Sequence, residues 1–400
     1  LVKANKTCYN VIINKKRKCK MLLSHKIELY PTSKQSDYLF HCVANRRYMY
    51  NVLVAHYRNT SKLTKSIAVE LVKEHRAKFE WLQDVSTRVI RNTVDDIDKA
   101  IKRGWTPEAK VKRAKALKEA VTPKQKAKAI YHGLPSFAKR GVNESFSIRE
   151  KEKIKINGRK FRFEKLPKEL REIKMRELIR FDGTVKQVTI SLRAGKWFAS
   201  FLIETEDIKK QEPSFENVGV DLGVKELATL SDGKVFPAHK SYAKREKKLR
   251  QLNKKLARQV KDSNGWKVTK AKIQKLHYYV SESRKQALHE LTSWLSKNYK
   301  RIVIEDLAPS NMVKNRRLAK SIIDVGFGIF KEQMVYKCLI YGSELVLADR
   351  FFPSSKTCSN CGNVKKELKL SERIYICKEC NFKIDRDSNA SLNLAKWRPV

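Results

Sequence analysis

The chain has 400 residues, of which 88 are Lys or Arg and 42 are Asp or Glu, so its formal net charge is 88 − 42 = +46. This length is enough for two to three domains. A charge this large repels itself in a compact protein unless a polyanion relieves it, which favours nucleic acid as the partner. An anionic membrane is the weaker alternative, because the basic residues are spread along the chain and no apolar run approaches ~18 residues. No secretory signal is recognisable, so we expect a cytoplasmic protein.

The first part of the chain predicts a helical segment inserted into a β domain. Lys26–Pro31 reads as a strand closed by proline, and residues 31–133 follow as the helical segment. Apolar residues recur there at helical spacing. They predict helices over 36–59, over 62–76, after Trp81-Leu82, and in two short basic pieces of 106–131 divided by Thr122-Pro123. Thr122, Pro123 and Gln125 have the pattern of a capping box.

Two hairpins predict the rest of the β domain. Residues 153–163 alternate around Asn157-Gly158, a signal for a type I′ turn. Residues 185–192 and 197–203 alternate around Gly195. Together with the first strand, the hairpins predict a small antiparallel barrel or sheet.

The second part predicts an α/β fold with a mixed sheet. A polar linker over 207–216 precedes it. The predicted strands are 217–224, 226–230, 234–236, 301–305 and 344–348, with one helix near 321–341. Between them, residues 244–285 predict a long basic helical hairpin. Its first part, 244–261, has nine Lys or Arg and one acid, a density that favours contact with a phosphate backbone over an ordinary solvated face.

Three acids far apart in the sequence lie at core elements. Asp221 is in an apolar strand, Glu305 ends another, and Asp387 opens the last helical stretch. A buried Asp is costly without a partner, although Asp221 alone could be a solvent-facing strand end. Together the three acids suggest a site for divalent cations, and oxygen ligands suit Mg²⁺.

Four of the eight cysteines are clustered. Cys358-Ser-Asn-Cys361 and Cys377-Lys-Glu-Cys380 are separated by fifteen residues, the spacing of a four-cysteine zinc ribbon. We expect one structural zinc; a redox dithiol pair or a chance arrangement is the alternative. The other cysteines are scattered, as in proteins of a reducing cytosol.

These features resemble the TnpB family of transposon-encoded RNA-guided nucleases, which are related to the compact type V CRISPR effectors. The resemblance covers nearly the whole chain. Its most specific part is the paired CxxC followed by Asp385-Arg-Asp-x-Asn-Ala390. The other motifs, in the family's order, are Lys26–Thr32 with Gln35, Arg47 with Tyr50-Asn51, Trp81-Leu82, Leu166-Pro167, Val220–Gly223, Ile304–Leu307, Pro353–Ser355 and Cys358–Gly362. Region 104–133 departs from the pattern by being longer and more helical, Asn381 stands where Gly is common, and the tail of many relatives does not follow Asp387.

The resemblance implies a multi-domain α/β architecture. It implies a RuvC-type (RNase H-like) nuclease domain with an inserted zinc ribbon, and an N-terminal β-barrel wedge domain with an inserted helical recognition domain. The expected boundaries are 1–30 and 134–206 for the wedge domain, 31–133 for the recognition domain, 207–216 for the linker, 217–352 and 382–400 for the nuclease domain, and 353–381 for the zinc ribbon.

The implied function is RNA-guided DNA cleavage. Asp221, Glu305 and Asp387 would be the catalytic acids and would hold two Mg²⁺ ions, while Cys358, Cys361, Cys377 and Cys380 hold one Zn²⁺. The partners would be a transposon-derived guide RNA and double-stranded target DNA with a short adjacent motif, bound by a monomeric protein. The alternatives are a compact type V CRISPR effector, a nuclease-independent RNA-guided repressor, and a transposase that acts without RNA.

Two residue assignments stay open at this point. Thr87, Arg88 and Arg91 lie on the polar side of a predicted helix in the region that reads the adjacent motif in relatives. An ordinary solvated face is the more common explanation of such residues. The family pattern makes Asp387 the metal ligand and leaves Asp385 to anchor locally, to Arg386 or to a backbone amide. The alternative is that Asp387 only caps the helix.

Overall fold

The computed structural model describes residues 21–206, 212–369 and 372–398. The chain divides into two compact units, Leu1–Glu206 and Asp207–Val400. The first twenty residues of the predicted wedge domain and residues 207–211 of the predicted linker lie outside the described part. No described helix is long and apolar enough to cross a membrane.

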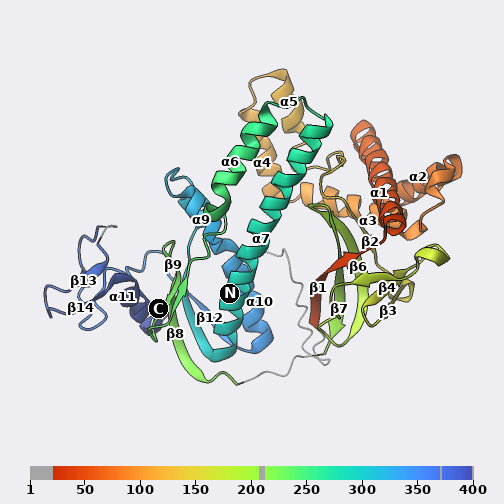
Figure 1. Ribbon diagram of the computed structural model, residues 1–400. Helices are drawn as coiled ribbons and strands as arrows, with labels where there is room; N and C mark the ends of the chain where they lie inside the picture. Colours follow the sequence, from red (N-terminus) through yellow and green to blue (C-terminus); the bar gives the residue numbers. More distant parts are fainter. Residues whose placement is uncertain (1–20, 207–211, 370–371, 399–400) are drawn as a thin grey trace. The chain divides into compact units, whose positions relative to one another are not determined.

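A seven-stranded antiparallel sheet forms the centre of the first unit (Figure 1). Its order is β2-β6-β7-β1-β5-β4-β3, and no backbone pairing joins its two edge strands within the described residues. The predicted barrel is therefore not closed by backbone hydrogen bonds. The strands are β1 (Met21–Tyr30), β2 (Ser145–Ile148), β3 (Ile154–Asn157), β4 (Lys160–Phe163), β5 (Ile173–Met175), β6 (Thr184–Arg193) and β7 (Lys196–Thr205).

The type I′ turn occurs in the other hairpin from the one predicted. Between β3 and β4 only Gly158 has a positive φ, whereas a type I′ turn needs positive φ at both central residues. Between β6 and β7 both Ala194 (φ 50°) and Gly195 (φ 78°) satisfy that requirement. The pairing of Arg193 with Lys196 closes this two-residue turn.

The first unit also has five helices, of which the first three pack on the sheet. Apolar side chains of the first three, such as Leu39, Leu53 and Ile90, share one buried cluster with sheet residues such as Phe201. Helices and sheet therefore fold around a common core. The predicted break at Thr122-Pro123 and its capping box are confirmed. The helices are α1 (Ser33–Thr60), α2 (Lys65–Lys78), α3 (Thr87–Gly104), α4 (Pro107–Lys118) and α5 (Pro123–Ile130).

A five-stranded mixed sheet forms the centre of the second unit, in the order β10-β9-β8-β11-β12. β8, β11 and β12 are parallel, and β9 and β10 are antiparallel to their neighbours. The strands are β8 (Phe215–Asp221), β9 (Glu226–Leu230), β10 (Val235–Pro237), β11 (Tyr299–Glu305) and β12 (Glu344–Ala348). Residues 215–216 of the predicted linker are thus the start of β8.

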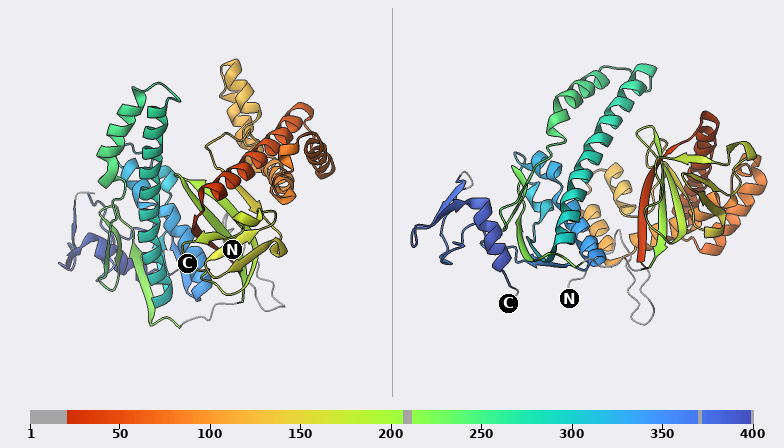
Figure 2. Two further views of the ribbon diagram at one scale, coloured as in Figure 1. Left: turned by 45° about the vertical axis from the view of Figure 1, so that its right-hand side comes forward. Right: turned by 60° about the horizontal axis from the view of Figure 1, so that its bottom comes forward.

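The two faces of this sheet bury different helices (Figure 2). Ile302 and Ile304 of β11 pack in a cluster with α7 (Asn264–Asn298) and α10 (Phe327–Tyr341). Val303, which points the other way, packs with Leu394 of α11 (Arg386–Lys396). Successive residues of a strand face opposite sides, so residue parity on β8 and β11 decides which side chains lie beside α11.

The predicted helix near 321–341 is two helices. α9 (Ala319–Val325) ends at Gly326, whose φ of 80° is left-handed, and α10 starts immediately after it. A helix cannot continue through that conformation, and glycine adopts it without steric cost. The short α8 (Pro309–Met312) precedes α9.

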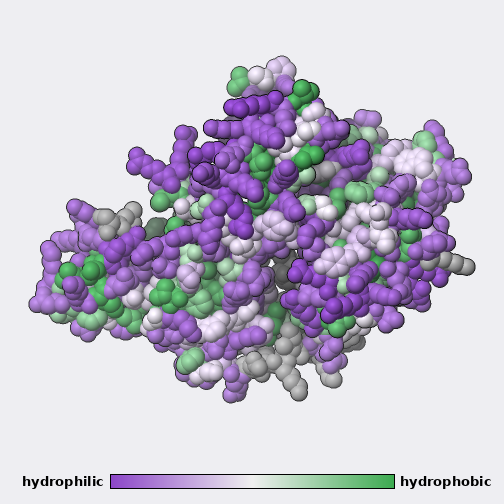
Figure 3. Space-filling view, viewed as in Figure 1, coloured by the Kyte–Doolittle hydropathy of each residue, from purple (hydrophilic) through white to green (hydrophobic). Residues whose placement is uncertain are grey.

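The basic hairpin consists of α6 (Ala243–Ala257) packed against α7. Asp324 of α9 fixes its base: the carboxylate accepts hydrogen bonds from the backbone amides of Tyr242 and Ala243 and from Arg284 of α7. Hydrophilic side chains dominate the hairpin on the face shown in Figure 3.

The cysteine segment, which holds the four clustered cysteines, contributes β13 (Ile374–Ile376) and β14 (Lys383–Asp385). Its small sheet therefore extends past residue 381, the predicted end of the zinc ribbon.

Candidate active site

Asp221 and Glu305 lie at the same edge of the mixed sheet. Val220 of β8 pairs in parallel with Ile304 of β11, and the two acids follow directly. Asp221 follows Gly219 by two residues, and Glu305 follows Val303 by two residues. Both earlier positions face α11, so the alternation of the strands points both carboxylates toward that helix. Glu305 was predicted at the end of its strand, and β11 does end there. Asp221 was predicted inside a strand over 217–224, whereas β8 ends at Asp221.

Gly219 allows α11 to lie directly on β8. A Cβ atom at this position would be 2.0 Å from the carbonyl oxygen of Ser391 and 2.3 Å from the backbone nitrogen of Ala395. Any other residue would therefore push the helix away. This close approach is what brings Asp387, in the first turn of α11, to the edge where Asp221 and Glu305 lie.

We call Asp221, Glu305 and Asp387 the acid trio. Burial, followed by the charges of Glu305 and Asp387, raises the pKa of Asp221 to about 8, while the nearby Arg386 opposes that effect. The three carboxylates thus occupy one electrostatic site. However, the oxygens of the three carboxylates are not all within 4.8 Å of one another. Among the described residues, only the ligand atoms of the four clustered cysteines lie that close together.

Two of the acids have other partners. The Ser354 hydroxyl donates to Oε1 of Glu305, and the guanidinium of Arg386 donates to Oδ1 of Asp387. The bond from Ser354 to Glu305 was not predicted from the sequence, although Ser354 belongs to the motif Pro353–Ser355. Arg386 was one of two expected partners of Asp385, and it pairs with Asp387.

Asp385 is the N-cap of α11, and its carboxylate accepts hydrogen bonds from the backbone amides of Asp387 and Ser388, both at 3.0 Å. The prediction that Asp385 anchors locally to a backbone amide is confirmed. The alternative in which Asp387 caps the helix is wrong, which leaves the carboxylate of Asp387 available to the acid trio.

The four clustered cysteines are arranged as zinc ligands. All four sulfurs lie within 4.8 Å of one another, with Cys358 Sγ and Cys380 Sγ 3.7 Å apart and Cys361 Sγ and Cys377 Sγ 3.6 Å apart. A tetrahedron with Zn–S bonds of about 2.3 Å has edges of about 3.8 Å. None of the four is in a disulfide. The arrangement fits a closed structural zinc site.

The residue after each CxxC explains the departure at Asn381. Gly362 follows Cys361 with a φ of 79°, and Asn381 follows Cys380 with a φ of 54°. Both positions therefore need the left-handed conformation. Asparagine tolerates this conformation better than other residues with side chains. Asn381 can therefore replace glycine without changing the turn that follows the second CxxC.

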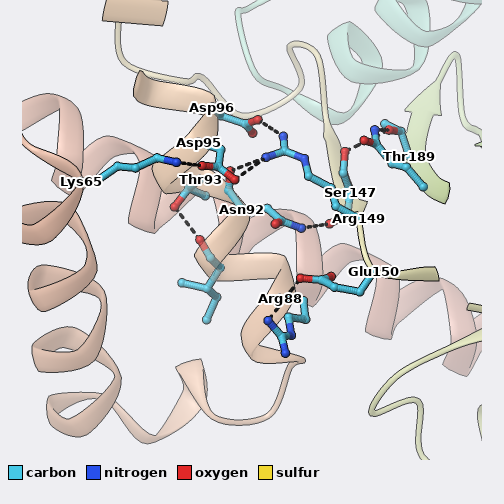
Figure 4. A network of polar contacts seen from close by, with 12 residues as sticks. Lys65, Arg88, Asn92, Thr93, Asp95, Asp96, Ser147, Arg149, Glu150 and Thr189 are labelled. Carbon is cyan, nitrogen blue, oxygen red and sulfur yellow. Dashed lines mark hydrogen bonds and ion pairs between the residues drawn. The ribbon is translucent and has the colours of Figure 1, made fainter. Parts of the chain in front are cut away.

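Thr87, Arg88 and Arg91 lie in the first unit, at the start of α3, and only one of them lacks a partner. Thr87 accepts a hydrogen bond from Arg76. Arg88 forms an ion pair with Glu150 at 3.2 Å (Figure 4). Arg91 is exposed and makes no hydrogen bond or ion pair with the described residues.

The opposite end of this polar network anchors α3 within the first unit. Arg149 forms ion pairs with Asp95 and Asp96 of α3, and Asp95 also pairs with Lys65 of α2 at 2.9 Å (Figure 4). The Lys65 hydrogen bond holds the pKa of Asp95 below its usual range. These ion pairs hold α3 in place within the first unit.

Comparison with known proteins gives matches along most of the chain. Residues 200–316 match the OrfB_IS605 family, described as a probable transposase, residues 327–394 match a Cas12f1-like TNB domain, and residues 21–65 match a helix-turn-helix domain. In this structure residues 21–65 form β1, α1 and the first residue of α2.

Two curated relatives and one solved structure are among the similar proteins. "Putative RNA-guided DNA endonuclease InsQ" from Escherichia coli K12 is 32% identical over 337 residues, which cover 80% of this chain and 77% of that protein. A "Putative RNA-guided DNA endonuclease" from Streptomyces pristinaespiralis is 36% identical, with 52% of this chain and 51% of that protein covered. A solved structure titled "Cryo-EM structure of the Cas12f1-sgRNA-target DNA complex" aligns with 94% of this chain and 99% of its own at 13% identity, with a TM-score of 0.48.

The mixed sheet with its acid trio and the four-cysteine segment define a RuvC-related, transposase-type α/β domain that carries a zinc-ribbon-like module. The extent of the similarity to the E. coli relative then makes the assignment specific. The chain belongs to the TnpB family.

Proposed function

We propose that this protein is an RNA-guided DNA endonuclease that hydrolyses phosphodiesters at the acid trio. The observation that carries the proposal is the convergence of Asp221, Glu305 and Asp387 from two strands and a helix onto one edge of a sheet. The names of the curated relatives support the guide-dependent part.

The acid trio has the chemistry of a site for two Mg²⁺ ions. Carboxylate oxygens are the ligands that Mg²⁺ prefers. The charges of Glu305 and Asp387, which after burial contribute to the raised pKa of Asp221, would favour a bound cation. When bound, the cations supply an activated water and stabilise the leaving oxygen. Asp221 and Glu305 hold their positions through the strands, and Asp387 holds its position through α11. No nucleophilic side chain is required.

The excess positive charge supports nucleic acid as the class of partner. The net charge of +46 favours a polyanion as the partner. Of the nine Lys or Arg in 244–261, only Arg250 forms an ion pair with an acid in the described structure. We propose that the α6–α7 hairpin contacts nucleic-acid backbone, that guide pairing reads the target, and that the protein acts as a monomer in a ribonucleoprotein.

The start of α3 is proposed to help read the adjacent motif. Arginine binds guanine bidentately in the major groove. Because Thr87 and Arg88 already have protein partners, Arg91 is the member of the predicted trio that is available for a base contact.

A cleavage assay with exchanged guides tests the function. The protein is co-expressed with its flanking transposon RNA, purified, and supplied with a plasmid library in which the bases beside the target are randomised. Cleavage should require Mg²⁺, follow the guide when the guide is changed, and disappear in the Asp221→Asn variant.

Each alternative gives a different result in the same assay. Cleavage that ignores the guide would favour a transposase acting without RNA, and guided binding without cleavage would favour a repressor. Either result would overturn the proposal. A repeat array beside the gene would point to a CRISPR effector instead of a transposon protein.

A further inference from the structure

Two asparagines of α11 are buried and hold the cysteine segment. Asn389 and Asn393 are four residues apart, so they share one face of the helix, and they are 0% and 5% exposed. Asn389 accepts a hydrogen bond from the Ser359 amide at 3.0 Å and donates to the Thr357 carbonyl at 2.7 Å. Asn393 donates to the carbonyls of Thr357 at 2.6 Å and Ser354 at 2.8 Å. Buried amides with all of these bonds fix both partners firmly.

Ser354 connects this face of α11 to the acid trio. Its side chain is buried, at 4% exposure, and its hydroxyl donates to Oε1 of Glu305. Its carbonyl is the one held by Asn393. A hydrogen bond to a carboxylate is stronger than one between neutral groups, so Ser354 restrains the direction in which the Glu305 carboxylate points.

The cysteine cluster lies at the other end of the same bonds. Thr357 and Ser359 flank Cys358, and Ser359 also accepts a hydrogen bond from Lys396 of α11 at 2.5 Å. The residues on both sides of Cys358 are therefore hydrogen-bonded to α11. The same helix carries Asp387 two residues before Asn389.

We propose that Ser354, Asn389 and Asn393 form a positioning bridge through which the folded cysteine cluster fixes Glu305 relative to Asp387. The bridge rests on the proposed function, because it assumes that Glu305 binds a catalytic cation. It gives the cysteine cluster a role beyond stabilising the end of the chain. Partners that orient metal ligands in this way change metal affinity or activity by about 10–100-fold when they are removed.

The test compares two adjacent serines in the ribonucleoprotein. Ser354→Ala removes the hydrogen bond to Glu305. Ser355→Ala is the matched control, because the Ser355 side chain makes no hydrogen bond in the described structure. For Ser354→Ala we expect the Mg²⁺ concentration for half-maximal cleavage to rise about 10-fold. Mn²⁺ binding, measured from free Mn²⁺ by electron paramagnetic resonance, should weaken by a similar factor, with zinc content and melting temperature unchanged.

A second pair of variants tests the connection to α11. Asn393→Ala should weaken Mn²⁺ binding as well. In the double variant with Ser354→Ala, the combined effect should be smaller than the sum of the single effects, because both act through one bridge. Ser354→Thr keeps the hydroxyl and should restore most of the Mn²⁺ affinity.

Two outcomes separate failure of the bridge from failure of the function. If Ser354→Ala binds Mn²⁺ and responds to Mg²⁺ like the wild type while Glu305→Gln abolishes cleavage, the bridge is wrong and the proposed function stands. If Glu305→Gln cleaves like the wild type, the proposed function is wrong and the bridge has no site to position.

Discussion

At the residue scale, the two neighbouring acids at the start of α11 have different tasks. Asp385 caps the helix, whereas Asp387 belongs to the acid trio. Asp387→Asn should abolish cleavage while the protein still binds guide RNA and target DNA. Asp385→Asn keeps an N-cap residue of similar quality and should keep most of the activity, while Asp385→Ala should keep only part and cost about 1 kcal/mol of stability. Cleavage and filter-binding assays on the three variants decide, and wild-type cleavage by Asp387→Asn contradicts the trio.

A second prediction at this scale concerns the adjacent motif. Arg91→Ala should relax the base preference at one position in a randomised-library cleavage assay, because a bidentate arginine contact discriminates by about 1–3 kcal/mol. Arg88→Ala is the control: its ion pair with Glu150 predicts a loss of local stability with the preference retained. An unchanged preference in Arg91→Ala removes this residue from the reading surface.

The sequence predicted single residues well where a pattern had one physical meaning. The CxxC spacing is such a pattern, because the four cysteine sulfurs do lie together. The acid that ends an apolar strand at Glu305 is another. Ser354 could not be assigned in the same way, because its task depends on a hydrogen bond to Glu305, 49 residues away in the chain. The partners of Thr87 and Arg88 were hidden for the same reason.

At the element scale, the packing of α10 on α7 buries a lysine. The ammonium of Lys337 donates to the His289 carbonyl and to the hydroxyls of Thr292 and Ser293 at 2.7–2.9 Å. Burial, and then the charge of Lys297, lower the pKa of Lys337 from 10.5 to about 8. The charged form is thus disfavoured in the folded state.

The sign of the resulting pH dependence follows from this lowered pKa. Stability from this group is fully present above pH 10.5, where the lysine is neutral in both states, and is lost as the pH falls through about 8. Relative to Lys337→Met, the wild type should therefore gain stability between pH 7.5 and pH 10, by at most about 3 kcal/mol. Urea unfolding of both proteins across that range measures the difference. A constant difference contradicts the burial of a strained charge.

The cysteine segment gives the second prediction at the element scale. Elemental analysis should find about one zinc per chain. Cys361→Ser should lose zinc and destabilise the C-terminal part, whereas substitution of the isolated, buried Cys338 by Ala should retain the zinc. A Cys361→Ser variant that keeps its zinc and its melting temperature would refute the four-cysteine site.

Elements were predicted better than their ends and connections. Most strands and helices follow from apolar periodicity, but the short strands β2, β5, β13 and β14 were not predicted. The break at Gly326 was missed because α9 and α10 are both apolar on one side, and a glycine inside such a pattern does not by itself specify a left-handed φ. Likewise, Asn157-Gly158 has the ideal sequence for a type I′ turn, yet the pairing of Asn157 with Lys160 places Gly158-Arg159 at the centre of that turn, and only Gly158 has a positive φ.

At the scale of the whole molecule, the charge of +46 predicts dependence on RNA. Without RNA the protein should be less stable, and its affinity for nucleic acid should fall steeply with salt, by roughly 0.7 to 0.9 in the log–log slope for each neutralised phosphate. Thermal melting with and without RNA, and binding titrations at several salt concentrations, measure both effects. A stable RNA-free protein whose binding ignores salt would contradict the proposal.

The acid trio also has an order in time, because its members come from β8, β11 and α11. A ribosome that has completed β11 has made both Asp221 and Glu305. Asp387 is added only after the four clustered cysteines. A nascent or prematurely terminated chain that stops before α11 can carry the basic hairpin without the third acid. Such a partial product cannot present the complete trio to a nucleic acid. Under the proposed function, cleavage therefore requires translation through residue 387.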